Sequence, residues 1–188
     1  MQFSQLIQEH IGVVSELDQQ SKNINAFVDL VCERLDAGNK VLFFGNGGSA
    51  ADSQHMAAEF MVRYFTHRKA LPAIALTTDS SILTAHTNDF EYSTVFSRQI
   101  EALGQAGDVA VGISTSGNSE NVYLGIKSAQ QKKIKTIVLT GQSGGDMKAL
   151  ADICISVPSS VTARIQECHI MIGHYLCARI DEYYEKSA

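Results

Sequence analysis

The chain has 188 residues, of which 45% are hydrophobic and 19% are charged, and its formal net charge at pH 7 is -5. This composition excludes a disordered chain, and the acidic balance argues against a nucleic-acid partner, which would require a basic surface. The length predicts a single domain over 1–188, made of a helical pair at 1–37 and an α/β core at 40–188.

No basic segment followed by an apolar run begins the chain, and no stretch of about 18 apolar residues could span a bilayer. We therefore expect a soluble, cytoplasmic protein without a membrane partner. None of the cysteines has CxxC spacing, which predicts buried thiols in a reducing compartment; they are Cys32, Cys154, Cys168 and Cys177.

Two amphipathic helices are predicted before the first strand. The first covers residues 2–20 and places on one stripe Phe3, Leu6, Ile7, Ile11, Val14 and Leu17. The second runs from about Asn25 to Asp36, and Gly38 ends it. No earlier strand exists for these helices to cover, so their apolar faces pack either against another subunit or on the sheet edge.

From Lys40 onward, apolar runs alternate with helical stretches. The predicted strands are Val41–Phe44, Ala73–Thr77, Val109–Ile113, Thr136–Leu139 and Ile153–Val157. The predicted helices lie at about 49–64, 79–87, 92–103, 119–132, 144–150 and 161–184. Strands that are apolar throughout are typical of a parallel sheet covered on both faces, so we expect a doubly wound α/β sandwich with ligands at the carboxyl ends of its strands.

The first strand leads into Gly45-Asn46-Gly47-Gly48, and a helix with a short capping signature, Ser49 and Asp52, follows. Glycines let the backbone approach a ligand, and the first helical turn offers free N–H groups to an anion. The pattern is neither a Walker loop nor GxGxxG, so it indicates phosphate handling without implying a nucleotide.

Farther along the same helix, His55 and Glu59 are four residues apart and share a face. Such a pair is usually a solvated surface contact, but the glycine turn upstream favours a functional role, either in holding a metal or in moving a proton. Asn88-Asp89 alone indicates no more than a turn, and the turn from Thr140 to Gly145 is predicted to be structural.

The third strand ends in a loop with four hydroxyls in six residues, Ser114-Thr115-Ser116-Gly117-Asn118-Ser119. Hydroxyl donors, backbone donors and a following helix N-terminus suit a phosphate monoester. A plain capped turn is the alternative. The location at a strand end favours a ligand loop.

The last helix is mostly apolar, yet it carries Gln166, His169 and His174. Gln166 and His174 fall near one stripe, whereas His169 is offset. A hydrogen-bonded core histidine is the ordinary interpretation. If this helix faces the helix of His55 and Glu59, two histidines, a glutamate and a glutamine come together.

Taken together, the chain resembles the phosphoheptose isomerase family of sugar-isomerase (SIS) domain proteins. The resemblance runs nearly end to end and depends on motifs in matching order and spacing: Gly45–Ser49, His55 with Glu59, Asn88-Asp89, Ser114–Ser119, and Arg164-Ile165-Gln166-Glu167 with His174. One departure is Ala163, where some members carry an aspartate; it puts only the surroundings of the site in doubt.

The resemblance implies a three-layer α/β/α sandwich with a five-stranded parallel sheet and two extra N-terminal helices. It also implies a homotetramer that converts sedoheptulose 7-phosphate to an aldoheptose phosphate for lipopolysaccharide precursors. The phosphate would be held by Ser114, Thr115, Ser116 and Ser119, and the sugar site lined by Asn46, Gly47, Gly48, Asn88 and Asp89. Zinc would be bound by His55, Glu59, Gln166 and His174, with Glu59 and His174 as the acid–base pair and Glu59 and Gln166 also contacting substrate.

Two other functions share the scaffold. One related group binds the replication initiator DnaA as a non-catalytic tetramer, and its members resemble this chain but lack the catalytic glutamate and the last histidine. Because Glu59 and His174 are both present, the enzyme is favoured. A sugar-phosphate-sensing regulator is disfavoured by the lack of a DNA-binding segment or basic patch.

Overall fold

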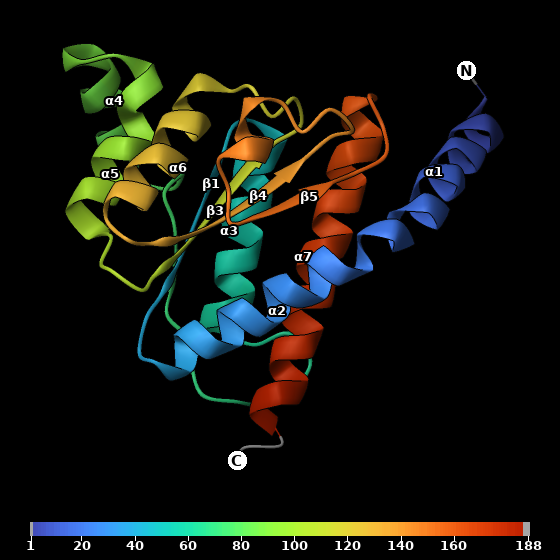
Figure 1. Ribbon diagram of the computed structural model, residues 1–188, viewed down its shortest axis with the longest axis horizontal. Coiled ribbons are helices and arrows are strands. Elements are labelled where there is room, and N and C mark those ends of the chain that lie inside the picture. Colours follow the sequence, from blue (N-terminus) through green and yellow to red (C-terminus); the bar gives the residue numbers. More distant parts are fainter. Residues whose placement is uncertain (1, 186–188) are drawn as a thin grey trace.

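A five-stranded parallel sheet with the order β2-β1-β3-β4-β5 lies at the centre of the computed structural model (Figure 1). Residues 2–185 are described. The strands are β1 (Val41–Gly45), β2 (Ala73–Ala75), β3 (Val109–Ser114), β4 (Lys135–Thr140) and β5 (Ile153–Ser156). Each coincides with one of the predicted apolar runs. The predicted α/β/α sandwich with a five-stranded parallel sheet is confirmed.

The helices are α1 (Phe3–Leu17), α2 (Ser21–Asp36), α3 (Gly48–Met61), α4 (Ser80–Asp89), α5 (Val95–Leu103), α6 (Glu120–Gln131) and α7 (Thr162–Glu185). Single 3-10 turns are η1 (Asp18–Gln20), η2 (Tyr92–Thr94) and η3 (Asp146–Ala149). Within the described part of the chain, no helix combines the length and the apolar character needed to cross a membrane.

Three local predictions differ from the structure. The stretch 144–150 forms only the turn η3, because Gly144 and Gly145 have φ of 73° and 54°, values outside the helical region. Asn88 and Asp89 belong to the last turn of α4 and do not follow it. Helix α3 begins one residue early with Gly47 as its N-cap, and no side chain caps it, so the predicted capping signature is not formed.

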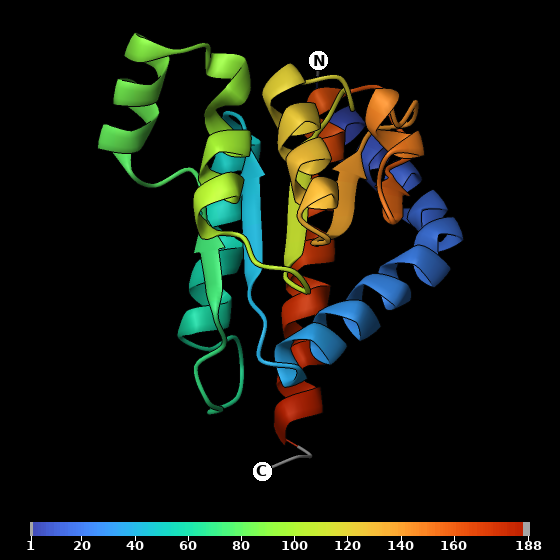
Figure 2. The same cartoon turned by 60° about the vertical axis from the view of Figure 1, so that its left-hand side comes forward.

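Alternate residues of β1 divide the core into two layers. Phe43 packs edge-on against Phe60 of α3, in a cluster that α2 and α7 also join. Phe44 packs against Phe96 of α5, in a second cluster with α6. Figure 2 shows these helix layers on opposite sides of the sheet. Burial of strand residues on both faces explains why the strands read as continuous apolar runs.

The two N-terminal helices behave differently. Helix α2 buries Phe27, Val31 and Leu35 in the core and contacts α7 and β5. Of the two predicted alternatives, α2 therefore packs on the edge of the sheet, where β5 lies. Helix α1 extends away from the sheet (Figure 1) and leaves Phe3 and Ile7 75% and 40% exposed. The N-terminal part of the α1 stripe is thus uncovered in one copy of the chain, whereas Leu17 at its other end is buried.

The topology places both predicted ligand loops at one end of the sheet. After β1 the chain moves outward to β2, and it then returns to β3 on the other side of β1. Gly45 at the end of β1 pairs with Ile113 near the end of β3. The crevice of a doubly wound sheet forms at such a reversal of strand order.

Candidate active site

The glycine turn brings α3 close to α7. Gly47, the N-cap of α3, has a φ of 55°, which side chains of L-residues rarely permit. A Cβ on Gly48 would lie 2.7 Å from Nε2 of Gln166. Glycine at position 48 therefore lets the Gln166 amide of α7 reach the start of α3.

Asn46 is held in place by two residues that sequence patterns did not single out. Its Nδ2 donates to Oδ1 of Asn121, and Nδ2 of Asn121 donates back to Asn46 Oδ1, both at 2.8 Å. The hydroxyl of Tyr92 also donates to Asn46 Oδ1 at 2.9 Å. The side chain of Asn46 is thus fixed between the glycine turn and α6.

The loop between β3 and α6 gathers hydroxyls as predicted. Ser114 Oγ lies 2.9 Å from Ser119 Oγ and 3.4 Å from Ser116 Oγ. Ser119 is the N-cap of α6, but its side chain makes no capping bond. The three hydroxyls consequently converge at a helix N-terminus, where an anion is favoured.

A cavity of about 540 Å³ adjoins this loop. Thr115 and Ser116 line it together with Ser143, Ser159 and Ser160. Its walls carry hydroxyl and amide groups and no lysine or arginine. Such a lining recognises ligands through neutral hydrogen bonds.

His55, Glu59 and His174 meet at one point. Nε2 of His55 is 3.4 Å from Nε2 of His174 and 3.3 Å from Oε1 of Glu59. The contact forms because α3 packs on α7, the arrangement on which the sequence prediction depended. Two imidazoles and a carboxylate within reach of one another can exchange protons or bind a cation.

An aromatic wall borders the cluster. The ring of Tyr64 stacks on His174 with centroids 5.5 Å apart and an interplanar angle of 22°. Burial raises the pKa of Tyr64, with smaller contributions from Cys177, Glu59 and Asp181, so its phenol is neutral at pH 7. Sequence reasoning missed this residue because its segment carries no periodic or motif signal.

The donor chemistry of the cluster suits zinc. When nitrogen and oxygen ligands bind a tetrahedral zinc ion at about 2.0–2.1 Å, any two ligand atoms lie about 3.3–3.4 Å apart. The distances from His55 Nε2 to His174 Nε2 and to Glu59 Oε1 match this value. Gln166 is eight residues from His174, a rise of about 12 Å along α7, and its amide lies against Gly48. Over residues 2–185, no group of three or more His, Cys, Asp or Glu is arranged to hold a metal. The residue types fit the ion, while the four-ligand set is not assembled.

Two of the predicted sugar-site residues lie apart from this cluster. Asn88 donates to Asp89 at 2.8 Å, and both are exposed on α4, which projects from the body in Figure 1.

His169 is a core histidine, as its position off the stripe of Gln166 and His174 predicted. It is fully buried and contacts the Thr140 carbonyl oxygen at 3.1 Å.

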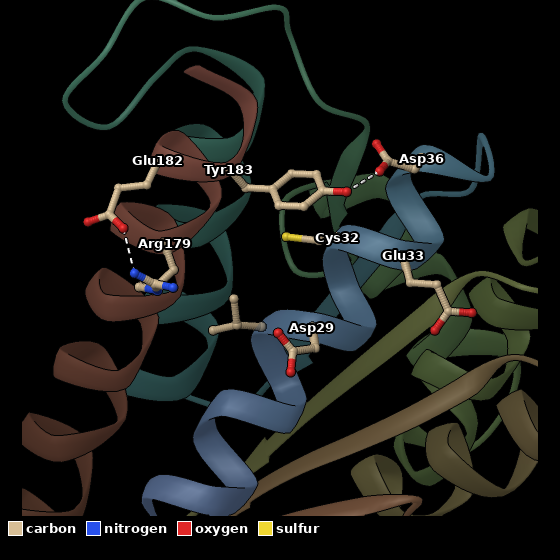
Figure 3. Close-up of a pocket in the computed structure, with 8 residues that line it drawn as sticks. Asp29, Cys32, Glu33, Asp36, Arg179, Glu182 and Tyr183 are labelled. Atoms are coloured by element: carbon tan, nitrogen blue, oxygen red, sulfur yellow. Dashed lines mark hydrogen bonds and ion pairs between the residues drawn. The ribbon is translucent and has the colours of Figure 1, made fainter. Parts of the chain in front are cut away.

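A cavity of about 540 Å³ between α2 and α7 contains none of the predicted site residues (Figure 3). Four of its polar residues form two pairs, Tyr183 with Asp36 and Arg179 with Glu182. Burial, reinforced by Asp36 and Asp29, raises the pKa of Cys32 to about 11, so this thiol is not a nucleophile. This cavity therefore carries none of the predicted chemistry.

Comparisons with known proteins show the family to which the chain belongs. The model of the SIS domain matches residues 5–141. The phosphoheptose isomerase of Akkermansia muciniphila is 50% identical over 165 residues, 88% of this chain and 87% of that protein. The solved phosphoheptose isomerase of Neisseria gonorrhoeae has a TM-score of 0.90 and 43% identity, covering 96% of this chain and 97% of that one. The one from Francisella tularensis has a TM-score of 0.92 and 35% identity, with 96% of each chain covered.

Proposed function

The chain belongs to the SIS domain family and is an isomerase, and on that premise we propose that it converts sedoheptulose 7-phosphate to D-glycero-D-manno-heptose 7-phosphate. The reaction would supply an aldoheptose phosphate for ADP-heptose and the lipopolysaccharide core. The observation that carries the proposal is the meeting of Glu59 and His174 at His55 Nε2.

Substrate would bind through its phosphate. Ser114, Ser116 and Ser119 would donate hydroxyl hydrogen bonds to the phosphate oxygens, and the N-terminus of α6 would favour the negative charge. Thr115 would complete the loop. Asn46, Gly47 and Gly48 would line the sugar, with Asn88 and Asp89 supplying further polar groups.

The chemistry moves one carbon-bound proton and one oxygen-bound proton. Glu59 would remove the proton from C1 of the ketose and return it to C2, passing through an enediolate. His174 would move the proton from the C1 oxygen to the C2 oxygen. The two side chains suit these roles because both lie within 3.4 Å of a single atom, His55 Nε2.

Zinc would be held by His55, Glu59, Gln166 and His174. When bound, such an ion polarises a carbonyl and stabilises negative charge on its oxygen. Gln166 and Glu59 would also contact the substrate. For His55, Glu59 and His174 the proposal is supported by the donor types and by the two ligand-sized separations at His55. Gln166 is included from the family resemblance.

The reaction is tested with purified protein and sedoheptulose 7-phosphate in D₂O. Formation of the aldose creates an anomeric C1–H signal that the ketose lacks, and an enediolate route carries deuterium to C2. Conversion with deuterium incorporation supports the proposal. Absence of conversion, together with tight binding of DnaA, would instead identify the non-catalytic scaffold.

A further inference from the structure

Arg68 and Asp181 form a buried ion pair beside the candidate active site. Nε of Arg68 lies 2.7 Å from Oδ1 of Asp181, and each side chain is only 2% exposed. No other ion pair over residues 2–185 has both side chains buried to this extent. Moving two charges out of water is unfavourable unless their remaining hydrogen-bonding groups are satisfied, so the partners of this pair are informative.

The guanidinium of Arg68 caps the C-terminal turn of α3, the helix that carries Glu59. It donates from Nη2 to the Glu59 carbonyl oxygen and from Nη1 to the Phe60 carbonyl oxygen, both at 2.8 Å. These carbonyls belong to the last turn of α3, where helical carbonyls have no partner within the helix. Arg68 consequently fixes the backbone of Glu59 itself.

Asp181 fixes the segment that follows α3. Its Oδ2 accepts hydrogen bonds from the backbone N–H groups of Phe65 at 2.6 Å and Thr66 at 2.9 Å. Burial alone would raise the pKa of Asp181, but these N–H groups and Arg68 hold it below its usual range, so the carboxylate is charged. The segment is thereby tied to α7 by a charged acceptor.

The same segment supplies the aromatic wall of the site. Tyr64 precedes Phe65 directly and stacks on His174. His174 and Asp181 are seven residues apart on α7, about two turns, and therefore lie on one face of the helix. One helix thus carries both the imidazole and the anchor of the ring that stacks on it.

We propose that Arg68 and Asp181 are positioning residues that hold Glu59 and the Tyr64 segment in register with His174. The pair touches neither reacting atoms nor substrate groups; it acts through the end of α3 and through Tyr64. The effect of the pair on the reaction rate rests on the proposed function. Its effect on the position of Glu59 and Tyr64 relative to His174 does not.

The test compares Asp181→Asn and Arg68→Lys with a control pair on the same helix, Arg179→Gln and Glu182→Gln. The control residues form an exposed ion pair, with side chains 48% and 52% exposed. The first readout is the NMR signal of the His174 ring in substrate-free enzyme, assigned with His174→Gln. The second is kcat and KM for sedoheptulose 7-phosphate, corrected for the folded fraction from thermal unfolding.

We expect the His174 signal to shift in both test variants, because the ring current of Tyr64 changes, and to stay in place in both controls. We expect kcat to fall 10- to 100-fold with KM within threefold of wild type, because the hydroxyl loop after β3 is held by other contacts. Arg68→Lys keeps the charge and serves as the milder variant if Asp181→Asn does not fold.

An unmoved His174 signal overturns the proposal, whatever the rate, because the pair would then act only on folding. A shifted signal with unchanged kcat per folded molecule overturns its catalytic part. If wild-type protein does not convert sedoheptulose 7-phosphate, the proposed function fails, and the NMR comparison still decides the geometry.

Discussion

His55 and His174, separated by 119 residues in the chain, bring their Nε2 atoms within 3.4 Å of each other. Their rings meet edge to face with centroids 5.0 Å apart. Neither segment forms a site alone, since His55 and Glu59 would be an ordinary helical pair without the imidazole of α7. The packing of α3 on α7 is therefore the step that brings the residues of two sequence motifs into one cluster.

Replacing Glu59 with glutamine removes the proposed carbon base while keeping the shape of the side chain. We expect kcat to fall about 100- to 10,000-fold, the usual contribution of general base catalysis, with an unchanged circular dichroism spectrum. Steady-state assays with sedoheptulose 7-phosphate measure this. Glu182→Gln, an exposed change on α7, should keep wild-type activity. A Glu59→Gln enzyme of near-normal rate would exclude this residue as the base.

Removing the metal should abolish activity if zinc polarises the substrate carbonyl. We expect elemental analysis to find about one zinc per chain, and dialysis against a chelator to lower kcat in parallel with zinc content. Addition of zinc should restore the rate. His55→Gln should lower both the zinc content of the protein and the rate that added zinc recovers. Full activity in protein that contains no metal would rule out this role.

Ser119 tests the phosphate loop without disturbing the helix that follows it, because its side chain makes no capping bond. We expect Ser119→Ala to raise KM for sedoheptulose 7-phosphate about 10- to 100-fold, the loss of one hydrogen bond to a charged group, with little change in kcat. Ser128→Ala, at the other end of α6, is the matched control. Unphosphorylated sedoheptulose should be handled equally by wild type and Ser119→Ala. A defect that is equal for both sugars would contradict phosphate binding here.

Some of this site follows from local sequence and some does not. Residues such as Ser114 and Ser119 could be placed because they flank a strand and a helix whose signals are strong. Tyr92 and Asn121 could not, since their bonds to Asn46 cross 46 and 75 residues and leave no periodic trace. The predicted helix at 144–150 failed for a different reason, namely the backbone conformation of its two glycines.

The core likewise contains features that could be predicted from the sequence and features that could not. The strands were predictable because residues such as Val41 and Leu42 are both fully buried, which makes a run apolar on both faces. The ion pair of Arg68 and Asp181 was not, because each lies in a segment where a charged residue normally faces solvent. Only the folded chain shows that both side chains are enclosed.

The exposed stripe of α1 predicts association between copies of the chain. With a protomer mass of 20.4 kDa, the homotetramer that the family resemblance implies has a mass of about 82 kDa, four times that value. We expect light scattering to give this mass for wild type and a smaller one for Ile7→Asp, because a charge on an apolar interface is costly. Gln5→Asp adds the same charge about 200° around the helix and should leave the mass unchanged. Equal masses for wild type and Ile7→Asp would place the interface elsewhere.

His169 predicts how stability depends on pH. Burial lowers its pKa from 6.5 to about 4, against a smaller opposing effect of the Thr140 carbonyl, and its Nδ1 is buried without a hydrogen-bond partner. Because the folded pKa lies below the unfolded one, the neutral ring stabilises the fold fully above about pH 6.5, and this contribution is lost as pH falls toward 4.

His169→Gln keeps an amide donor for the Thr140 carbonyl but cannot titrate. We expect the free energy of unfolding of wild type to fall by about 2 kcal/mol more than that of the variant between about pH 7 and pH 5. Denaturant titrations at a fixed protein concentration measure both curves, and the carboxylates common to the two proteins cancel in the difference. Curves that stay parallel over this range would mean that His169 is not held neutral by the fold.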